Sequence, residues 1–523
     1  MKIFRIFIFV LGLAVVVSSC DLTEHPSFMS EETAYNGATN IQSSLDGVYS
    51  AVIKYGYYGN DLFYSTFCNS GMFVSGLGNS NQDPDNLTLT ALKPMATAVY
   101  TEKPWAAMYK AIERANRLIH FVPQIDDPKT ANDLKINDAL GEAYFLRAFV
   151  YFSLVQMWGE IPLRLEPTTN ENIHMAKSPT DVIYAQIVED AKKAEQLMTH
   201  YPLNRPGYPA SEAASMLLAK IYMTMATTDD AVPVEHQDEQ LCWQLAYESA
   251  KKVYGKYKLN DNYGDIFDAT TSDGTAESIF ELQYNEVVSS NHGRLFTAAH
   301  AVKAQTWGRV RVDAEIIDLF RNCYPKDSIR YKETFIYEWV KYGTAQIQKT
   351  YPSENMTRNV FNKSFPYVYK HWVKNRNAAT PYYSRNFVVY RYADLLLMLA
   401  EISNELNNGE QEGYVNEVLA RVGLSTDDFV PDPVTGADYK GGQDAFRKAI
   451  TLEYRFELLA EVHDWFNNRR RGYQWFKEMV IDPHNNYAGF NPKVDITLSD
   501  DPDRVMHYPI PQSEINTNDL IEN

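Results

Sequence analysis

The segment "GEAYFLRAFVYFSLVQMWGEIPL", residues 141–163, decides the fold class of this chain, because it is apolar on nearly every side of the helix that it predicts. A helix that is apolar all round is buried among neighbours. It is expected to end at Gly159 and Pro162, residues typical of a helix C-terminus and of the position just beyond it. The core is therefore predicted to consist of packed helices.

Amphipathic helices are predicted on both sides of this segment, with apolar residues at three- and four-residue steps. They cover residues 103–122, 178–198, 211–226, 244–259, 392–409 and 413–424. Ala219, Ala250 and Ala400 supply small side chains where such helices would cross. The paired units resemble tetratricopeptide repeats without a strict period. The sequence thus predicts a mainly α fold of degenerate tetratricopeptide-like helical repeats, with long irregular loops and a few short strands.

Three segments between the helices have another character. Residues 69–90 are rich in Gly, Asn and Asp and predict an irregular surface loop, while residues 277–310 begin with the alternation of a strand and then lose any period. Between Lys326 and Arg376, ten Lys or Arg stand against four Asp or Glu. This basic portion could face a partner, although a solvated charged face is the favoured interpretation.

The N-terminus has the pattern of a secretory signal. Lys2 and Arg5 flank an apolar run over residues 6–17, which is shorter than the roughly 20 residues that a spanning helix needs. The run ends in "VSSC", which resembles a lipobox, so residues 1–19 are predicted to be a lipoprotein signal peptide and Cys20 the lipid attachment point. The alternative is an incidental cysteine in a cleaved signal. Residues 20–40 are expected to form a tether.

The remaining cysteines support lipidation of Cys20. They are Cys68, Cys242 and Cys323, an odd number at wide spacing, whereas an exported protein held by disulfides would show paired cysteines. The formal net charge of -18 argues against nucleic acid as a partner, and it also argues against adsorption of the bulk of the chain to an anionic membrane. Contact with a membrane is therefore expected through the lipid anchor only.

The chain carries none of the motifs that mark common catalytic sites: no His-Glu-x-x-His helix, no Gly-x-Ser-x-Gly elbow, no phosphate-binding Gly-rich loop and no Cys-x-x-Cys pair. No common catalytic chemistry is therefore indicated by a motif, and no cofactor or metal is expected. The segment "NSNQDPDN", residues 79–86, offers oxygens for a bound calcium ion, but its acids miss the spacing of the twelve-residue calcium loop. A polar turn is the favoured interpretation.

Several segments in order resemble the SusD/RagB family of outer-membrane nutrient-uptake lipoproteins. They are "SLDGVYSAV" (44–52), "PWAAMYKAIERANRLI" (104–119), the segment 141–163 with Glu142, Arg147 and Tyr151, "YRYADLLLMLAEISNEL" (390–406), "EYRFELLAEVHDWFNNRRRG" (453–472) and "YPIPQSEINTND" (508–519). The chain departs from the family pattern at Val462, Asp464, Asn467 and Arg471, where the family usually has glycine, arginine, aspartate and tryptophan. It resembles a divergent member.

The resemblance implies a protein that is not an enzyme: a cell-surface lipoprotein of the outer membrane that binds oligosaccharides and delivers them to a TonB-dependent, SusC-like transporter. It also implies an N-terminal helical region over residues 41–260 and a C-terminal region over residues 261–523, together in one compact domain. Three alternatives stay open: a peptide-binding uptake lipoprotein, a repeat-based protein-interaction scaffold, and, less favoured, a secreted glycoside hydrolase.

In relatives the ligand surface is built by segments that correspond here to residues 57–90 and 284–310. Sugars offer apolar C–H faces and many hydroxyls, so aromatic rings beside amide or basic groups suit them. The candidate ligand-binding residues are Tyr57, Phe73, Asn79, Asn81, Tyr284, Asn291, His292 and Trp307. Trp307 is the strongest of them, because it stands beside Gly308 and Arg309 in a stretch without a clear period.

Three glutamates recur every four residues, at Glu453, Glu457 and Glu461, and so share one face of a predicted helix. A catalytic use of these carboxylates is the less favoured interpretation. We expect instead a buried or half-buried salt-bridge network, with Arg455 and the arginines at 469–471 near enough to pair with the glutamates or their neighbours.

Overall fold

A computed structural model of the chain describes residues 34–35, 37–75, 84–122, 134–268, 270–351, 365–489 and 497–521. The predicted lipidation site Cys20 and the candidates Asn79 and Asn81 lie outside these ranges. Over the ranges that are described, no helix is long and apolar enough to cross a membrane.

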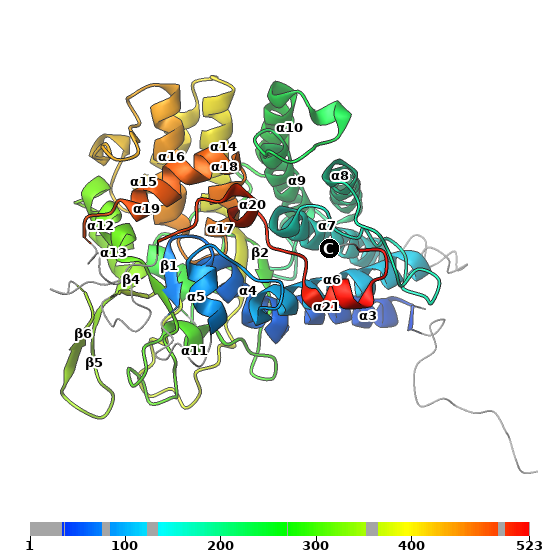
Figure 1. The fold of residues 1–523 in the computed structure, drawn as a ribbon, viewed down its shortest axis with the longest axis horizontal. Helices are drawn as coiled ribbons and strands as arrows, with labels where there is room; N and C mark the ends of the chain where they lie inside the picture. The colour runs from blue at the N-terminus through cyan, green and yellow to red at the C-terminus, as the bar shows by residue number, and fades with distance from the viewer. Residues whose placement is uncertain are drawn as a thin grey trace, which may run out of the picture.

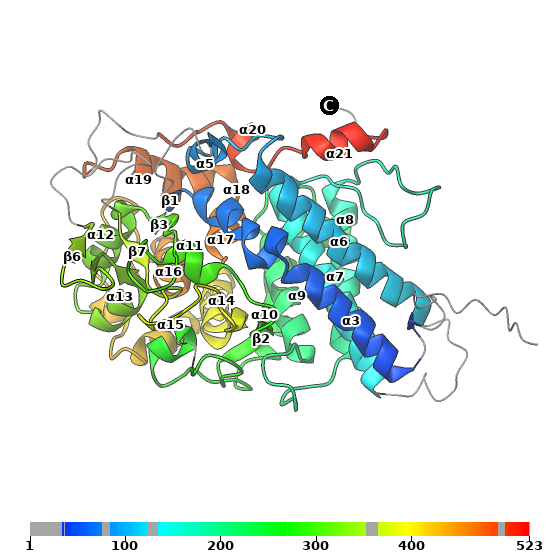
Figure 2. The same ribbon diagram turned by 90° about the horizontal axis from the view of Figure 1, so that it is seen from below.

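Helices dominate the structure, which confirms the predicted mainly α fold (Figure 1). The N-terminal group comprises α3 (Ala38–Val52), α6 (Val99–Phe121), α7 (Leu134–Trp158), α8 (Thr180–Leu197), α9 (Ser211–Met225) and α10 (Glu239–Lys251). The C-terminal group is built on α14 (Tyr392–Glu405), α15 (Gln411–Ala420) and α16 (Gln443–Leu458). From α3 to α10 the named helices that follow one another pack side by side, while in the C-terminal group α14 packs on both α15 and α16. Helix α10 packs on α14, so the two groups join through this pair (Figure 2).

Helix α7 lies at the centre of the N-terminal group, in contact with α3, α6 and α8. Its apolar side chains are buried all round, as the sequence predicts. The buried guanidinium of Arg147 is satisfied in place, because its Nε and Nη2 donate to the two carboxylate oxygens of Asp190 at 2.7 and 2.8 Å. A bidentate pair of this kind fixes the side chains of α7 and α8 against each other.

Helix α6 begins earlier than the position of its proline suggests. The first helical residue is Val99, so Pro104 lies inside the helix and not in its first turn. Proline has no N–H for the carbonyl oxygen four residues earlier. The hydroxyl of Ser65 donates to that oxygen, on Tyr100, at 2.6 Å. A side chain distant in sequence thus replaces the missing bond and keeps the helix continuous.

The strands are short and lie mainly in the C-terminal half. One sheet has the order β1 (Phe73–Ser75), β3 (Val310–Val312), β7 (Tyr367–Val368) and β4 (Phe335–Ile336). The strand predicted after residue 277 is present as β2 (Ser278–Leu282), which pairs antiparallel with β8 (Phe387–Arg391). Glu281 on β2 is buried like its apolar neighbours, since Asn386 and the N–H of Gly274 donate to its carboxylate. A hairpin of β5 (Glu338–Val340) and β6 (Ile347–Lys349) completes the set.

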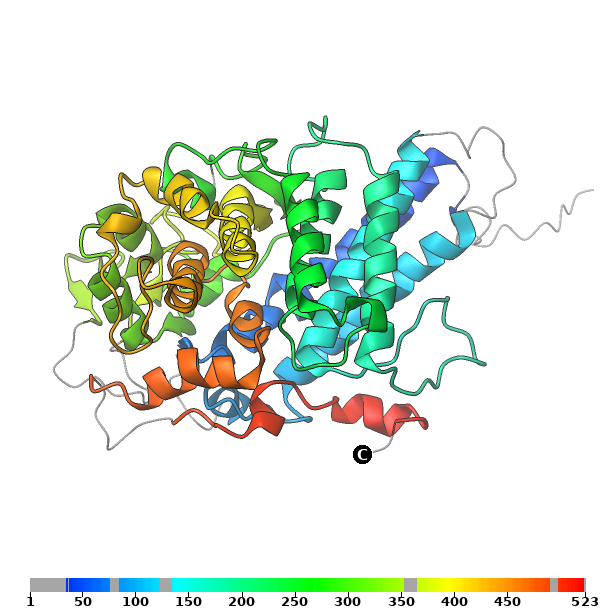
Figure 3. The ribbon, with the colours of Figure 1, turned by 90° about the horizontal axis from the view of Figure 1, so that it is seen from above.

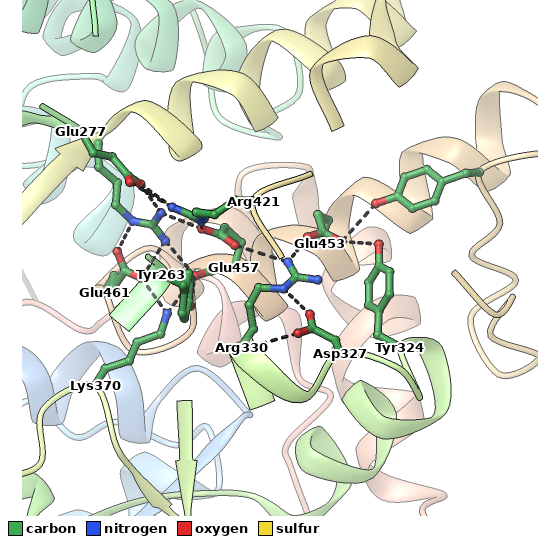
Figure 4. Close-up of polar contacts among 12 residues, drawn as sticks. Tyr263, Glu277, Tyr324, Asp327, Arg330, Lys370, Arg421, Glu453, Glu457 and Glu461 are labelled. Atoms are coloured by element: carbon green, nitrogen blue, oxygen red, sulfur yellow. Dashed lines mark hydrogen bonds and ion pairs between the residues drawn. The ribbon is translucent and has the colours of Figure 1, made fainter. Parts of the chain in front are cut away.

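The glutamates of α16 form a buried ion-pair network, as predicted (Figure 4). Glu457 contacts Arg330 at 3.3 Å, Arg391 at 2.7 Å and also Arg421. Burial by itself would raise the pKa of the Glu457 carboxyl, but the three guanidinium groups outweigh burial and hold its pKa well below its usual range. Glu457 is therefore ionised in the folded protein at neutral pH.

The partners within this network differ from those predicted. Glu461 contacts Lys370 and Arg391, each at 2.7 Å, and Glu453 contacts Arg330. The arginines near the end of α16 bind elsewhere: Arg455 donates to the carbonyl oxygen of Met479, Arg469 to that of Asn69, and Arg470 and Arg471 pair with Glu401. Arg455 and residues 469–471 therefore do not pair with the glutamates of α16 themselves, because basic groups from distant segments occupy those positions. Arg470 and Arg471 pair with a neighbour instead, Glu401 on α14, which packs on α16.

The C-terminal segment runs back along the N-terminal helices (Figure 3). It includes α17 (Asp464–Arg469), α18 (Gly472–Phe476), α20 (Pro502–Val505) and α21 (Gln512–Thr517). Trp465 donates to the side-chain oxygen of Asn69 at 3.0 Å, and the Tyr508 hydroxyl donates to the carbonyl oxygen of Ser65 at 2.8 Å. One continuous cluster of buried apolar side chains extends from Tyr35 to Tyr508.

Candidate functional site

The two segments expected to build the ligand surface meet in the structure. The first contributes η1 (Tyr55–Gly59), and the second contributes α11 (His292–Phe296), which lies at the lower edge of the molecule in Figure 1. The N–H of Asn291 donates to the carbonyl oxygen of Gly59 at 3.0 Å, and Nε2 of His292 lies 2.7 Å from the carbonyl oxygen of Tyr58. Hydrogen bonds to main-chain carbonyl oxygens therefore hold these two segments against each other.

Trp307 is fixed against α11 by its own backbone. The N–H of Trp307 donates to the carbonyl oxygen of Arg294 at 2.8 Å, and the N–H of Arg309 donates to that of Leu295 at 2.7 Å. Gly308 between them has φ +55°, and a Cβ there would lie 2.6 Å from Cε1 of Tyr367. Only glycine fits this backbone comfortably, so the turn that presents Trp307 depends on it.

Aromatic and basic side chains gather around Trp307, which is itself half-buried. The guanidinium carbons of Arg294 and Arg309 lie 3.8 and 4.3 Å from the centroid of its ring. Nη1 of Arg294 also lies 3.3 Å from the hydroxyl of Tyr382, a side chain that is 46% exposed. Tyr55 is 55% exposed. We call these five residues, Tyr55, Arg294, Trp307, Arg309 and Tyr382, the Trp307 surface.

Tyr55 belongs to this surface electrostatically as well. Burial and the nearby Asp61 raise the pKa of its phenol, while Arg309, Asn291 and Arg294 act in the opposite direction. These groups are thus close enough to influence the same hydroxyl. Asn291 is buried, its Nδ2 donates to Oδ1 of Asn60 at 3.2 Å, and its own Oδ1 has no hydrogen-bond partner within the described part of the chain.

The other described candidates lie in the core. Tyr57, Phe73, Tyr284 and His292 are each at most 5% exposed, so they offer a ligand no free ring face. Burial lowers the pKa of His292 to about 3, which keeps its ring neutral at physiological pH. Neighbouring aromatic rings surround it, with Phe63 at 4.2 Å between centroids.

Sequence reasoning missed Tyr55, Arg294 and Tyr382. Tyr55 stands two residues before the predicted Tyr57 in "YGYYGN", residues 55–60, where the sequence does not reveal which tyrosine points outward. Tyr382 follows the basic portion that ends at Arg376. Within the residues that the structure describes, no group of three or more His, Cys, Asp or Glu side chains is placed to hold a metal ion.

Comparison with known proteins identifies the class. Residues 266–523 match the SusD family, and residues 22–223 match a family described as starch-binding and associating with the outer membrane. The chain is 24% identical to SusD-like protein P2 of Formosa agariphila over 93% of this chain and 94% of that protein. The chain belongs to the SusD/RagB family.

Solved structures of the same fold include several SusD proteins. A SusD homologue from Bacteroides thetaiotaomicron superposes with a TM-score of 0.73 at 19% identity, covering 94% of this chain and 97% of that one. A laminarin-binding SusD-like protein gives 0.68 at 20% identity, with 93% and 98% covered. A structure described as holding a xylogluco-oligosaccharide gives 0.70 at 15% identity, with 92% and 97% covered. The shared fold is thus established over nearly the whole chain.

Proposed function

We propose that this protein binds an oligosaccharide at the Trp307 surface and delivers it to a TonB-dependent, SusC-like transporter of the outer membrane. The carrying observation is the set of partly exposed rings of Tyr55, Trp307 and Tyr382 beside hydrogen-bond donors on Arg294 and Arg309. Aromatic rings stack on the apolar faces of sugars, and the donors satisfy hydroxyls. The protein acts by binding and not by catalysis.

Membership of the SusD/RagB family supports this role. Two neighbours of the same fold are described as binding laminarin or holding a xylogluco-oligosaccharide, so the scaffold accommodates glycans in other proteins. The family match described as associating with the outer membrane, together with "VSSC" at residues 17–20, supports a lipid anchor on Cys20 that holds the protein at the cell surface. The anchor would keep the binding face near the transporter.

The test is calorimetric titration of residues 21–523 with laminarin, xyloglucan and other plant, host and microbial oligosaccharides. We expect heat of binding with at least one glycan class and its loss in Trp307→Ala. Trp475→Ala is the matched control, since Trp475 on α18 is also half-buried and also lies beside an arginine, 5.4 Å from the Arg471 guanidinium carbon. The control variant should bind like the parent protein.

Equal binding by the parent and Trp307→Ala proteins would show that the glycan-binding site lies elsewhere on the molecule. If no glycan gave heat of binding and peptides did bind, peptide uptake would replace oligosaccharide binding as the proposed function. Co-purification of the full-length protein with an outer-membrane transporter tests the delivery step separately from sugar binding.

A further inference from the structure

We propose that the oligosaccharide bound at the Trp307 surface is anionic, and that Arg294 and Arg309 bind its carboxylate or sulfate groups. This inference rests on the proposed function, because it names the class of glycan taken by the same site. It goes beyond the neutral glucans named for the related structures, and it follows from the charges and contacts around Trp307.

Within the described ranges, neither Arg294 nor Arg309 forms an ion pair with an Asp or Glu. Nε of Arg294 has no hydrogen-bond partner there. Elsewhere in this protein some buried arginines pair with carboxylates, as Arg391 does with Glu457 and Glu461, while others donate to main-chain carbonyl oxygens, as Arg455 and Arg469 do. Arginines left unpaired beside an aromatic surface are therefore available to an incoming anion.

The stacking geometry leaves the arginine donors usable. A guanidinium that lies over an aromatic ring contacts it through its flat face, while its N–H groups point outward in the guanidinium plane. Those N–H groups match the two oxygens of a carboxylate or the oxygens of a sulfate. Arg294 and Arg309, whose guanidinium carbons lie 3.8 and 4.3 Å from the centroid of the Trp307 ring, carry N–H groups of this kind at the Trp307 surface.

The same contacts disfavour a purely neutral sugar at Trp307. A neutral sugar would stack on the open face of the indole ring, as aromatic sugar sites do. Here two cations lie against that ring, which leaves less of it open to a neutral sugar. An anionic sugar keeps the arginines in place and neutralises them.

The chain around the site is free of acids over long stretches. Residues 287–312 contain four Arg or Lys and no Asp or Glu, and residues 365–393 contain five Arg or Lys and no Asp or Glu, in a protein with a net charge of -18. The two stretches lie side by side, because Ser290 and Tyr383 exchange main-chain hydrogen bonds of 2.9 and 3.0 Å. The stretch that carries Trp307 therefore brings no acid to the Trp307 surface. In the second stretch Lys370 and Arg391 pair with Glu461 and Lys374 pairs with Glu333, so these three do not add free positive charge.

One acid lies beneath this region. Asp61 acts on the Tyr55 phenol, but its side chain is buried and takes a hydrogen bond from Nδ2 of Asn60 at 2.7 Å. Burial raises the pKa of Asp61 to about 6. Asp61 does not pair with Arg294 or Arg309, so the two arginines keep their charge for a ligand.

The experiment compares sugars that differ in charge alone. Residues 21–523 are titrated with oligogalacturonides, with the same oligomers after reduction of their carboxyl groups, and with sulfated and unsulfated galactan oligosaccharides. We expect the acidic member of one pair to bind at least about tenfold more tightly than its neutral counterpart, as charge-assisted hydrogen bonds require. Raising the salt from about 50 to about 500 mM should shrink that ratio.

Arg294→Gln and Arg309→Gln should each remove most of the preference for the acidic sugar. Arg504→Gln is the control, because Arg504 is exposed and lies on α20, away from the site. Unchanged thermal unfolding of all three variants shows that loss of binding is not loss of folding. The pair that responds distinguishes a carboxylate from a sulfate ligand.

The outcomes separate this inference from the proposed function. Binding of neutral and acidic partners with equal affinity, or binding of neutral glycans alone, overturns the anionic inference and leaves glycan binding intact. Binding of an acidic peptide such as a short oligoglutamate, with no response to any glycan, overturns both.

Discussion

Replacing Glu457 by glutamine is expected to lower the free energy of unfolding by about 3–5 kcal/mol, the cost of breaking a buried ion pair by removing one partner. The Glu457 carboxylate is fully buried and lies against three guanidinium groups, those of Arg330, Arg391 and Arg421. Glutamine has nearly the same shape, so packing is preserved while the charge is lost. Its amide N–H groups would also point at arginine donors, which leaves those donors without an acceptor.

Urea unfolding followed by circular dichroism measures this change through the midpoint and slope of the transition. Glu189→Gln is the control, because Glu189 pairs with Lys193 at 2.7 Å on an exposed face of α8, where such a pair contributes about 0.5 kcal/mol or less. A Glu457→Gln protein that unfolds within about 1 kcal/mol of the parent would refute the claim that the network stabilises the C-terminal half.

Three further outcomes follow from positions described above or adjacent to them. Gly308→Ala should lower the stability measured by thermal unfolding by about 1–3 kcal/mol, because the added Cβ would meet Tyr367. Gly343 has φ +71° but open space around it, so Gly343→Ala should lower the stability less; equal losses would contradict this. Burial lowers the pKa of His463 to about 4, so below pH 6.5 the unfolded chain binds a proton that the folded protein does not bind. This difference lowers the free energy of unfolding by roughly 2 kcal/mol at pH 5. The His463→Gln variant should therefore lose less stability than the parent protein between pH 7 and pH 5. Burial raises the pKa of Asp464 from 3.8 to about 7, so ionisation of this carboxyl lowers the free energy of unfolding as pH rises between these values. The asparagine in Asp464→Asn can still accept from the N–H of Ala460, so this variant should be more stable than the parent at pH 8 by up to roughly 4 kcal/mol. A variant that is less stable at pH 8 would contradict the argument.

The helices could be predicted from the sequence because their signal is local. Apolar residues at three- and four-residue steps over 178–198 and 392–409 gave helices close to the observed bounds of α8 and α14. The start of α6 could not be predicted in this way, because the continuity of that helix at Pro104 depends on Ser65. The hydroxyl that completes the helix comes from a different part of the chain.

The partners of charged groups were harder to predict for the same reason. The spacing of Glu453, Glu457 and Glu461 placed them on one face, and their burial together was predicted from that spacing. Their cations come from α13 (Ser328–Thr334), from Lys370 just after β7, from β8 and from the end of α15, which the tertiary fold alone brings to α16. Arginines nearby in sequence point to other acceptors.

The candidate site shows a similar division. The two segments expected to form it do meet, and Trp307 remains the residue on which the proposal depends. Which ring of "YGYYGN" is exposed is set by packing: Tyr57 is fully buried, while Tyr55 is 55% exposed two residues away. The alternation of buried and exposed side chains in an irregular helical turn follows no fixed period that a sequence pattern reveals.

The hydrogen bonds from Trp465 and Tyr508 to Asn69 and Ser65 join parts of the chain about 400 residues apart. Contacts between such distant residues close only after the intervening chain is in place. The N-terminal helices therefore lack part of their packing until the last tenth of the protein has been made. During synthesis the chain would expose apolar surface for that whole interval, which favours aggregation unless chaperones hold the nascent protein.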